Sequence, residues 1–120
     1  MTPVAAVTTP LSICARRLHE RLQAGEVIQL VDVREDQELA IARLDRPVIH
    51  LPLSRAAEWM DRVNGLLDRD QPVAVLCHAG VRSWQFGCWL IEHQGFKTVL
   101  NLQGGIDAWS VDVDPAVPRY

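Results

Sequence analysis

The sequence PVAVLCHAGVRS, from Pro72 to Ser83, contains the features that decide the fold. Its first five residues, 72–76, are apolar and rich in valine, which predicts a short buried strand of a parallel sheet. Cys77 follows this strand, and a glycine-containing loop leads the chain to Ser83. Serine is a favoured helix N-cap, so we expect a helix from Ser83 to about Gln94. A strand, a tight loop and a helix in this order are typical of an α/β domain.

Similar segments alternate along the rest of the chain. Short apolar runs predict three further strands, at residues 27–33, 48–51 and 98–100. Amphipathic or capped runs predict four further helices, at residues 12–24 with Ser12 as N-cap, 37–42, 55–67 and 104–109. We expect an irregular N-terminal lead at 1–10 and a C-terminal tail at 111–120. The pattern predicts one α/β domain over residues 1–120, with three layers: a mainly parallel central sheet of about five strands and helices on both faces.

The composition is that of a globular protein without a strongly basic surface. The 120 residues are 48% hydrophobic and carry a formal net charge of −3, which argues against binding to nucleic acid or to an anionic membrane. No apolar stretch approaches the ~20 residues of a membrane span, and residues 1–10 do not resemble a signal peptide. An odd number of cysteines (Cys14, Cys77 and Cys88) favours free thiols in a reducing cytoplasm. Their spacing forms no metal-binding pattern.

Cys77 lies where parallel α/β sheets bind ligands, at the carboxyl end of a predicted strand. Gly80 permits a tight turn, so that successive backbone N–H groups point into a concave anion site. The start of the following helix and Arg82 add positive potential, and Arg82 can bind an oxyanion with two N–H groups. Such surroundings favour a thiolate or a persulfide anion on Cys77. We therefore expect Cys77 to be catalytic and the loop residues to bind substrate: His78, Ala79, Gly80, Val81 and Arg82. The alternative is a buried structural cysteine before an ordinary turn.

The length of this loop favours sulfur chemistry. Four residues separate Cys77 from Arg82, whereas phosphate-hydrolysing cysteine enzymes have a loop one residue longer. A shorter loop places fewer N–H groups around a smaller volume, which suits a terminal sulfur better than a tetrahedral phosphate or arsenate. Phosphatase or arsenate reductase activity is the less favoured alternative.

Four segments of the chain resemble the rhodanese family. Residues 31–35 (VDVRE), 49–53 (IHLPL), 77–83 (CHAGVRS) and 102–109 (LQGGIDAW) are similar to its DVRE, NIPL, C-x-x-G-x-R-S and L-x-G-G-x-x-A-W motifs. Their order and spacing agree with a single-domain member. Residues 43–48 depart from the family, which has a characteristic His and Gly in that segment.

The resemblance implies a rhodanese-like fold and a two-step sulfur transfer. Cys77 takes a sulfane sulfur from a donor such as thiosulfate and passes it, as a persulfide, to cyanide, a thiol or a protein cysteine. The implied partners are a small sulfur-containing anion and a protein acceptor, with no metal and no organic cofactor. The alternative is a low-turnover sulfur carrier or regulatory module that acts through a protein partner.

Three further residues are candidates for supporting roles. Asp32 and Arg34 lie at the end of the first long predicted strand, on the same edge of the sheet as Cys77. They orient the loop or bind the donor anion, or else they form a structural hydrogen-bonded pair. Ser83 supports the loop as the expected helix cap.

Overall fold

The sheet at the centre of the molecule has five parallel strands. In the computed structural model, which describes residues 8–120, the strands lie in the order β1-β5-β4-β2-β3. They are β1 Leu11–Ile13, β2 Gln29–Asp32, β3 Ile49–His50, β4 Val73–Leu76 and β5 Val99–Leu102. Asp32 pairs with Leu76, and Val75 pairs with Asn101, so the carboxyl ends of β2, β4 and β5 meet at one edge. The predicted parallel sheet of about five strands is confirmed.

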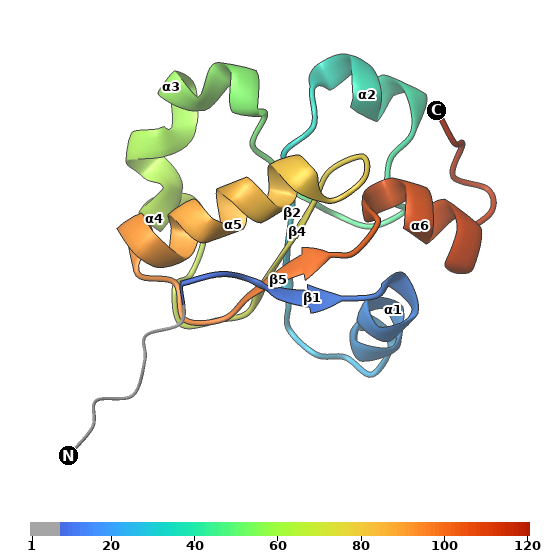
Figure 1. Cartoon of the computed structure of the whole chain (residues 1–120), viewed down its shortest axis with the longest axis horizontal. Helices are drawn as coiled ribbons and strands as arrows, with labels where there is room; N and C mark the ends of the chain where they lie inside the picture. Colours follow the sequence, from blue (N-terminus) through green and yellow to red (C-terminus); the bar gives the residue numbers. More distant parts are fainter. Residues whose placement is uncertain (1–7) are drawn as a thin grey trace.

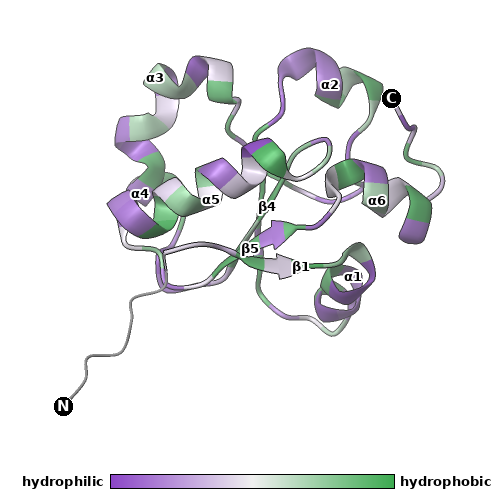
Figure 2. Ribbon diagram, in the orientation of Figure 1, coloured by the Kyte–Doolittle hydropathy of each residue, from purple (hydrophilic) through white to green (hydrophobic). Residues whose placement is uncertain are grey.

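Two hydrophobic cores lie on opposite faces of this sheet. In β4, Ala74 and Leu76 belong to one core and Val73 and Val75 to the other, because successive side chains of a strand alternate. Figure 1 shows α1 (Ala15–Gln23) and α6 (Gly105–Asp112) together on one side, and α3 (Ala56–Trp59), α4 (Val63–Leu66) and α5 (Val81–Gln94) on the other. β4 is coloured as hydrophobic in Figure 2, as expected for a strand that is covered on both faces. The three-layer arrangement agrees with the prediction.

The predicted helix at 12–24 begins too early. Leu11–Ile13 forms β1, which pairs with β5 at the edge of the sheet, and Cys14 occupies the N-cap of α1. Ser12 is therefore in a strand and caps nothing. The sequence did not predict this strand, because three residues are too few to show the alternation of a strand and the partner strand lies far along the sequence. Of the predicted irregular lead at 1–10, residues 1–7 lie outside the described residues.

The predicted helix at 55–67 is broken in the structure. It is divided into α3 and α4 by a 3₁₀ turn, Met60–Arg62, and preceded by another, Leu53–Arg55. Trp59 stands at the break, where its buried indole donates to the Pro52 carbonyl at 3.0 Å. Its ring packs edge-on against Phe86 of α5, with 5.5 Å between ring centroids. Burial of this large side chain takes precedence over a continuous helix.

The helix that follows Cys77 also differs from the prediction. It begins at Val81 with Gly80 as its N-cap, so Ser83 lies inside α5 and is not its cap. The apolar sequence suggested burial nearly all round, but Trp84 is 43% exposed and only one side of the helix is in the core. α6 extends three residues beyond the predicted end at Trp109, into the segment expected to be tail.

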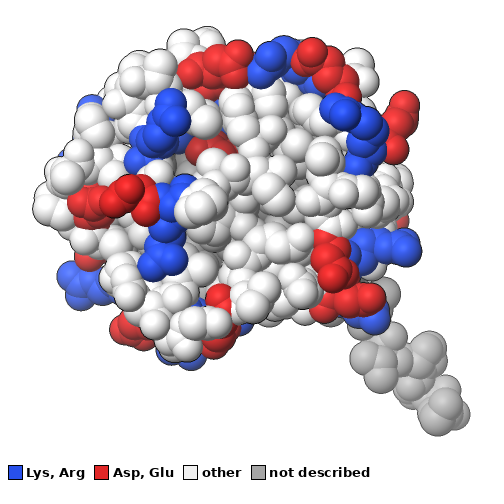
Figure 3. Space-filling view, turned by 180° about the vertical axis from the view of Figure 1, so that it is seen from behind, with Lys and Arg blue, Asp and Glu red and all other residues white. Residues whose placement is uncertain are grey.

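The surface carries charges of both signs. On the face shown in Figure 3, Lys and Arg side chains lie among Asp and Glu side chains. Arg17 pairs with Glu20 at 3.4 Å and Lys97 with Asp70 at 3.0 Å. Within residues 8–120, no helix is long and apolar enough to cross a membrane.

Candidate active site

Cys77 is buried directly after β4, at the carboxyl edge of the sheet. The backbone N–H of Gly80 donates to its Sγ at 3.1 Å, so the loop turns back over the sulfur as the sequence predicts. Gly80 has a φ of 110°, in the left-handed region that glycine adopts without a steric penalty. Ser83 brings its Oγ to 3.3 Å from the same sulfur. The loop and the first turn of α5 thus surround one sulfur atom with polar groups.

The start of α6 binds the carbonyl oxygens of the loop. The Ile106 N–H donates to the Cys77 carbonyl at 2.9 Å, and the Asp107 N–H donates to the His78 carbonyl at 3.3 Å. Gly105 permits this approach, because a Cβ at that position would overlap both carbonyl groups. Since these carbonyl groups face α6, the loop N–H groups are available to the sulfur.

Two opposing effects set the acidity of Cys77. Burial raises the pKa of its thiol, because a thiolate is poorly solvated in the interior. Hydrogen bonds from the Ser83 hydroxyl and from the backbone N–H groups of Ser83, Gly80 and Ala79 lower it. The hydrogen bonds prevail, so the pKa of Cys77 lies below the ordinary value for a thiol. A lowered pKa increases the fraction of nucleophilic thiolate at neutral pH.

Arg82 is held in a two-pronged ion pair with Glu38 of α2 (Asp36–Ile41). Its two terminal nitrogens donate to the Glu38 carboxylate at 2.7 and 2.8 Å. Glu38 also accepts the Glu35 N–H, as part of the capping box of α2. The hydrogen bond from Arg82 lowers the pKa of Glu38 to about 2, so the pair is ionised at neutral pH. The contact expected for a substrate oxyanion is made here with a carboxylate of the same chain.

Asp32 and Arg34 form a buried ion pair beside the loop. Arg34 is 0% exposed, and its guanidinium donates to Asp32 at 2.8 to 3.2 Å and to the Ala42 carbonyl at 2.8 Å. A fully buried guanidinium offers no surface to a donor anion. The geometry therefore favours the structural alternative for this pair over direct contact with substrate.

The remaining loop residues lie at the mouth of the site. His78 stacks on Tyr120, with 4.3 Å between ring centroids and an angle of 13° between the planes. The Tyr120 hydroxyl accepts from Arg34 at 2.9 Å and donates to Glu38 of α2 at 3.0 Å. The C-terminal residue thus contacts both the loop and α2, and Figure 1 shows the C-terminus beside α2. Ala79 and Val81 expose their side chains, and Ala79 contributes its backbone N–H to the sulfur.

Three residues of this site were not singled out from the sequence: Glu38, Asn101 and Tyr120. Asn101 is buried on β5 and contacts both Ser83 and the Gly80 carbonyl. The sequence does mark Asn101 as a candidate site residue, because it is a polar residue within an apolar strand that leads to a Gly-Gly pair. Tyr120 is 42 residues from His78 along the chain, and no local pattern connects them.

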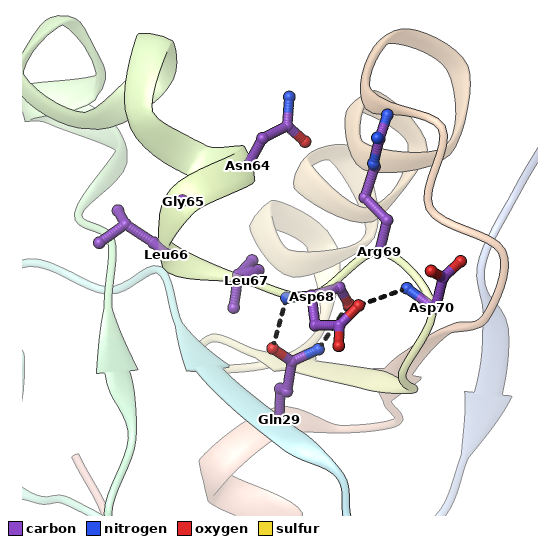
Figure 4. A pocket seen from close by; sticks show the side chains of 8 residues that line it. All are labelled: Gln29, Asn64, Gly65, Leu66, Leu67, Asp68, Arg69 and Asp70. Carbon is purple, nitrogen blue, oxygen red and sulfur yellow. Dashed lines mark hydrogen bonds between the residues drawn. The ribbon is translucent and has the colours of Figure 1, made fainter.

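A separate hollow of about 530 Å³ lies at the opposite edge of the sheet. Figure 4 shows Gln29, the first residue of β2, exchanging hydrogen bonds of 2.8 Å with the backbone of Asp68. The Asp70 N–H donates to the Asp68 carboxylate at 2.9 Å. The polar groups of this hollow thus bind the loop before β4, far from the cysteine. Over residues 8–120, no group of three or more His, Cys, Asp or Glu side chains is placed to hold a metal ion.

Comparisons with known proteins agree with this fold. A family model described as "Rhodanese-like domain" matches residues 15–112. A chloroplastic rhodanese-like/PpiC domain-containing protein 12 of Arabidopsis thaliana is 39% identical over 111 residues, covering 90% of this chain and 36% of that protein. The chain thus spans about a third of that relative. The putative sulfurtransferase YtwF of Bacillus subtilis is 36% identical over 103 residues, covering 86% of this chain and 93% of that protein.

Two further matches extend the comparison. The putative sulfur carrier protein YrkF of Bacillus subtilis is 31% identical over 91 residues, covering 76% of this chain and 46% of that protein. A crystal structure of a rhodanese-related protein from Thermoplasma volcanium superposes with a TM-score of 0.68 at 30% identity, covering 92% of this chain and 99% of that one. The match of a family model to most of the chain establishes what the cysteine loop and the sheet suggested: this chain belongs to the rhodanese-like domain family.

Proposed function

We propose that the chain transfers sulfane sulfur through a persulfide on Cys77. The observation that carries the proposal is the buried Cys77 sulfur, held by the Gly80 N–H at 3.1 Å in a short loop that ends at Arg82. The hydrogen bonds that lower the pKa of the thiol favour its nucleophilic form. The names of the relatives, a sulfurtransferase and a sulfur carrier protein, support the same chemistry.

The reaction has two displacements at sulfur. In the first, the Cys77 thiolate attacks the outer sulfur of thiosulfate, a new S–S bond forms, and sulfite leaves with the electron pair of the broken S–S bond. In the second, cyanide, a thiolate or a protein cysteine attacks the outer sulfur, and the electron pair of the persulfide bond returns to Sγ. Each step moves the negative charge between Sγ and the outer sulfur, so the site must stabilise an anion at both atoms.

In this proposal the loop stabilises that anion chiefly through its backbone. Ala79, Gly80 and Ser83 supply N–H groups, and the N-terminus of α5 adds the positive end of a helix dipole. Arg82 holds the loop to α2 through Glu38, while Ser83 lies against the sulfur. Asp32 and Arg34 support the loop from the interior and do not touch substrate.

One observation favours the alternative of a sulfur carrier with slow turnover on small donors. Arg82 is neutralised by Glu38, and Arg34 is neutralised by Asp32 and buried. The site therefore offers little uncompensated positive charge to a small dianion such as thiosulfate. A protein partner that presents a cysteine persulfide could bind through a larger contact area, and its binding would not depend on a positively charged site.

The decisive experiment is persulfide formation at Cys77. Exposed Cys14 and partly exposed Cys88 are competing thiols, so the test uses a Cys14→Ser/Cys88→Ser background. After incubation with thiosulfate, intact mass without reductant should rise by one sulfur atom, and Cys77→Ser in that background should show no gain. Absence of the gain with thiosulfate and with a persulfidated protein thiol would refute the proposal. Gain from the protein thiol alone would identify the carrier function.

We also propose that the chain works in the cytoplasm. The three cysteines carry no disulfide, and a reducing compartment keeps Cys77 as a thiol. Fractionation of cells that express the tagged chain tests this, and recovery in an oxidising compartment would contradict it.

A further inference from the structure

Asn101 is a buried polar residue of β5 that the proposed reaction does not use. Only 6% of it is exposed. Its Nδ2 donates to the Gly80 carbonyl at 3.0 Å, and its Oδ1 accepts from the Ser83 hydroxyl at 2.6 Å. An amide has one donor end and one acceptor end. Because the donor end is bound to a carbonyl, the acceptor end is fixed toward Ser83.

The Ser83 hydroxyl cannot donate a hydrogen bond to Cys77 and to Asn101 at the same time. It carries a single proton, and its Oγ lies 3.3 Å from the Cys77 sulfur as well as 2.6 Å from Asn101. When Cys77 is a thiol, its S–H points to Ser83 and Ser83 donates to Asn101, so every group is satisfied. When Cys77 is a thiolate, the Ser83 proton must turn to the sulfur, and Oδ1 of Asn101 loses its donor in the interior.

We propose that Asn101 is a positioning residue that holds the Ser83 proton away from the Cys77 sulfur and thereby disfavours the thiolate relative to both the thiol and the persulfide. This inference rests on the proposed function. In the persulfide, Sγ is bonded to two heavy atoms and is uncharged, while the negative charge lies on the outer sulfur. The Ser83 hydroxyl can then donate its hydrogen bond to Asn101 again. The asparagine thus favours transfer of the charge from Sγ to the incoming sulfur.

The charged groups around the loop do not account for this effect. They are Arg82 on α5, Glu38 on α2, the Asp32–Arg34 pair at the end of β2, Asp107 on α6 and, when protonated, His78 in the loop. Arg82, Arg34 and Asp107 each have an ion-pair partner. Substitution of Asn101 leaves all of these side chains and their pairings in place, so a change in the acidity of Cys77 is attributable to the amide.

The test is the pH profile of Cys77 alkylation by iodoacetamide in the Cys14→Ser/Cys88→Ser background. Asn101→Leu removes the acceptor and frees the Ser83 proton for the sulfur. We expect the pKa of Cys77 to fall by about one unit, a tenfold rise in its acid dissociation constant. Asn101→Asp keeps an acceptor oxygen toward Ser83 and adds an acidic group beside the sulfur. Both effects act against a fall in the pKa of Cys77, so no fall is expected in this variant. Asn101→Val replaces the leucine variant if the latter does not fold.

A second background separates the proton effect from loss of the contact with Gly80. In Ser83→Ala, Asn101→Leu should shift the pKa of Cys77 by less than about a third of a unit, because the hydroxyl that transmits the effect is absent. A rise or no change in the Asn101→Leu protein, a fall in Asn101→Asp, or an equal fall with and without Ser83 would overturn the inference. Alkylation requires no sulfur donor, so failure here is distinct from failure of persulfide formation.

Discussion

Gly105 offers the most direct test of how the loop is held. It has a φ of 60°, and a Cβ at this position would come closer than 3.0 Å to the backbone of Cys77 and His78. The backbone atoms of the loop cannot move away from such a Cβ as easily as the end of a flexible side chain could. Substitution of Gly105 by alanine should therefore push the loop away from α6 and disturb the two hydrogen bonds between them.

The chain provides a matched control in Gly25, after α1. Its φ is 84°, also in the left-handed region, but a Cβ there meets nothing within 4 Å. Gly25→Ala should thus cost only the conformational penalty, about 1–2 kcal/mol of the free energy of unfolding. Gly105→Ala adds the overlap, about 1–3 kcal/mol by analogy with overpacked cores, for a total of about 2–5 kcal/mol.

Urea unfolding measures both variants, and the rate of Cys77 alkylation reports on the loop in the folded protein. With total stabilities of about 5–15 kcal/mol typical of domains, Gly25→Ala should remain folded in water, and the unfolding curve of Gly105→Ala gives the fraction of that variant that is folded when its alkylation is measured. Gly105→Ala should lose more stability than Gly25→Ala and should also change the alkylation rate, which Gly25→Ala should leave unaltered. Equal destabilisation by the two substitutions, with wild-type alkylation in both, would refute the idea that α6 determines the loop conformation.

Substitutions at three other positions test the network around the loop. Arg82 lowers the pKa of Glu38 from 4.5 to about 2, so their pair stabilises the fold above pH 4.5 and loses this contribution as the pH falls toward 2. The difference in the free energy of unfolding between wild type and Glu38→Gln, measured in urea, should therefore shrink as the pH falls from 4.5 to 2. Arg34→Ala leaves Asp32 buried without its partner and should cost about 3–5 kcal/mol by thermal or urea unfolding. Tyr120→Phe keeps the stacked ring but removes the hydroxyl contacts, and should cost about 1 kcal/mol in the same assay, less than Tyr120→Ala.

The central part of the fold was predictable because its sequence signals are local. The valine-rich strand 72–76 and the cysteine loop identify β4 and the site from a dozen neighbouring residues. A strand covered on both faces is apolar at every position, and that is visible without a partner. The alternation of such runs with helices then fixes a parallel sheet and places Cys77 at its carboxyl edge.

The misplaced elements depend on contacts between distant segments. β1 exists because Leu11 and its neighbours pair with β5, almost ninety positions further along the chain. The break at Trp59 depends on Phe86 of α5. The helix cap expected at Ser83 is taken by Gly80, since the loop needs a left-handed residue there and the serine is required against the sulfur. In each case a tertiary contact overrides a correct local preference.

The active loop takes its shape from one neighbouring segment, residues 101–107. Asn101 binds the Gly80 carbonyl, Ile106 binds the Cys77 carbonyl and Asp107 binds the His78 carbonyl. Three loop carbonyls are thus bound by groups outside the loop, which leaves the loop N–H groups for the sulfur. This explains why the Gly-Gly segment accompanies the cysteine segment in the sequence, although more than twenty residues separate Cys77 from it. Because these contacts are made to loop backbone atoms, the exposed side chains of Ala79 and Val81 can vary without removing them. Under the proposed function, the anion site is therefore formed before any sulfur arrives, and variation in the loop is free to serve recognition of the proposed donor or acceptor.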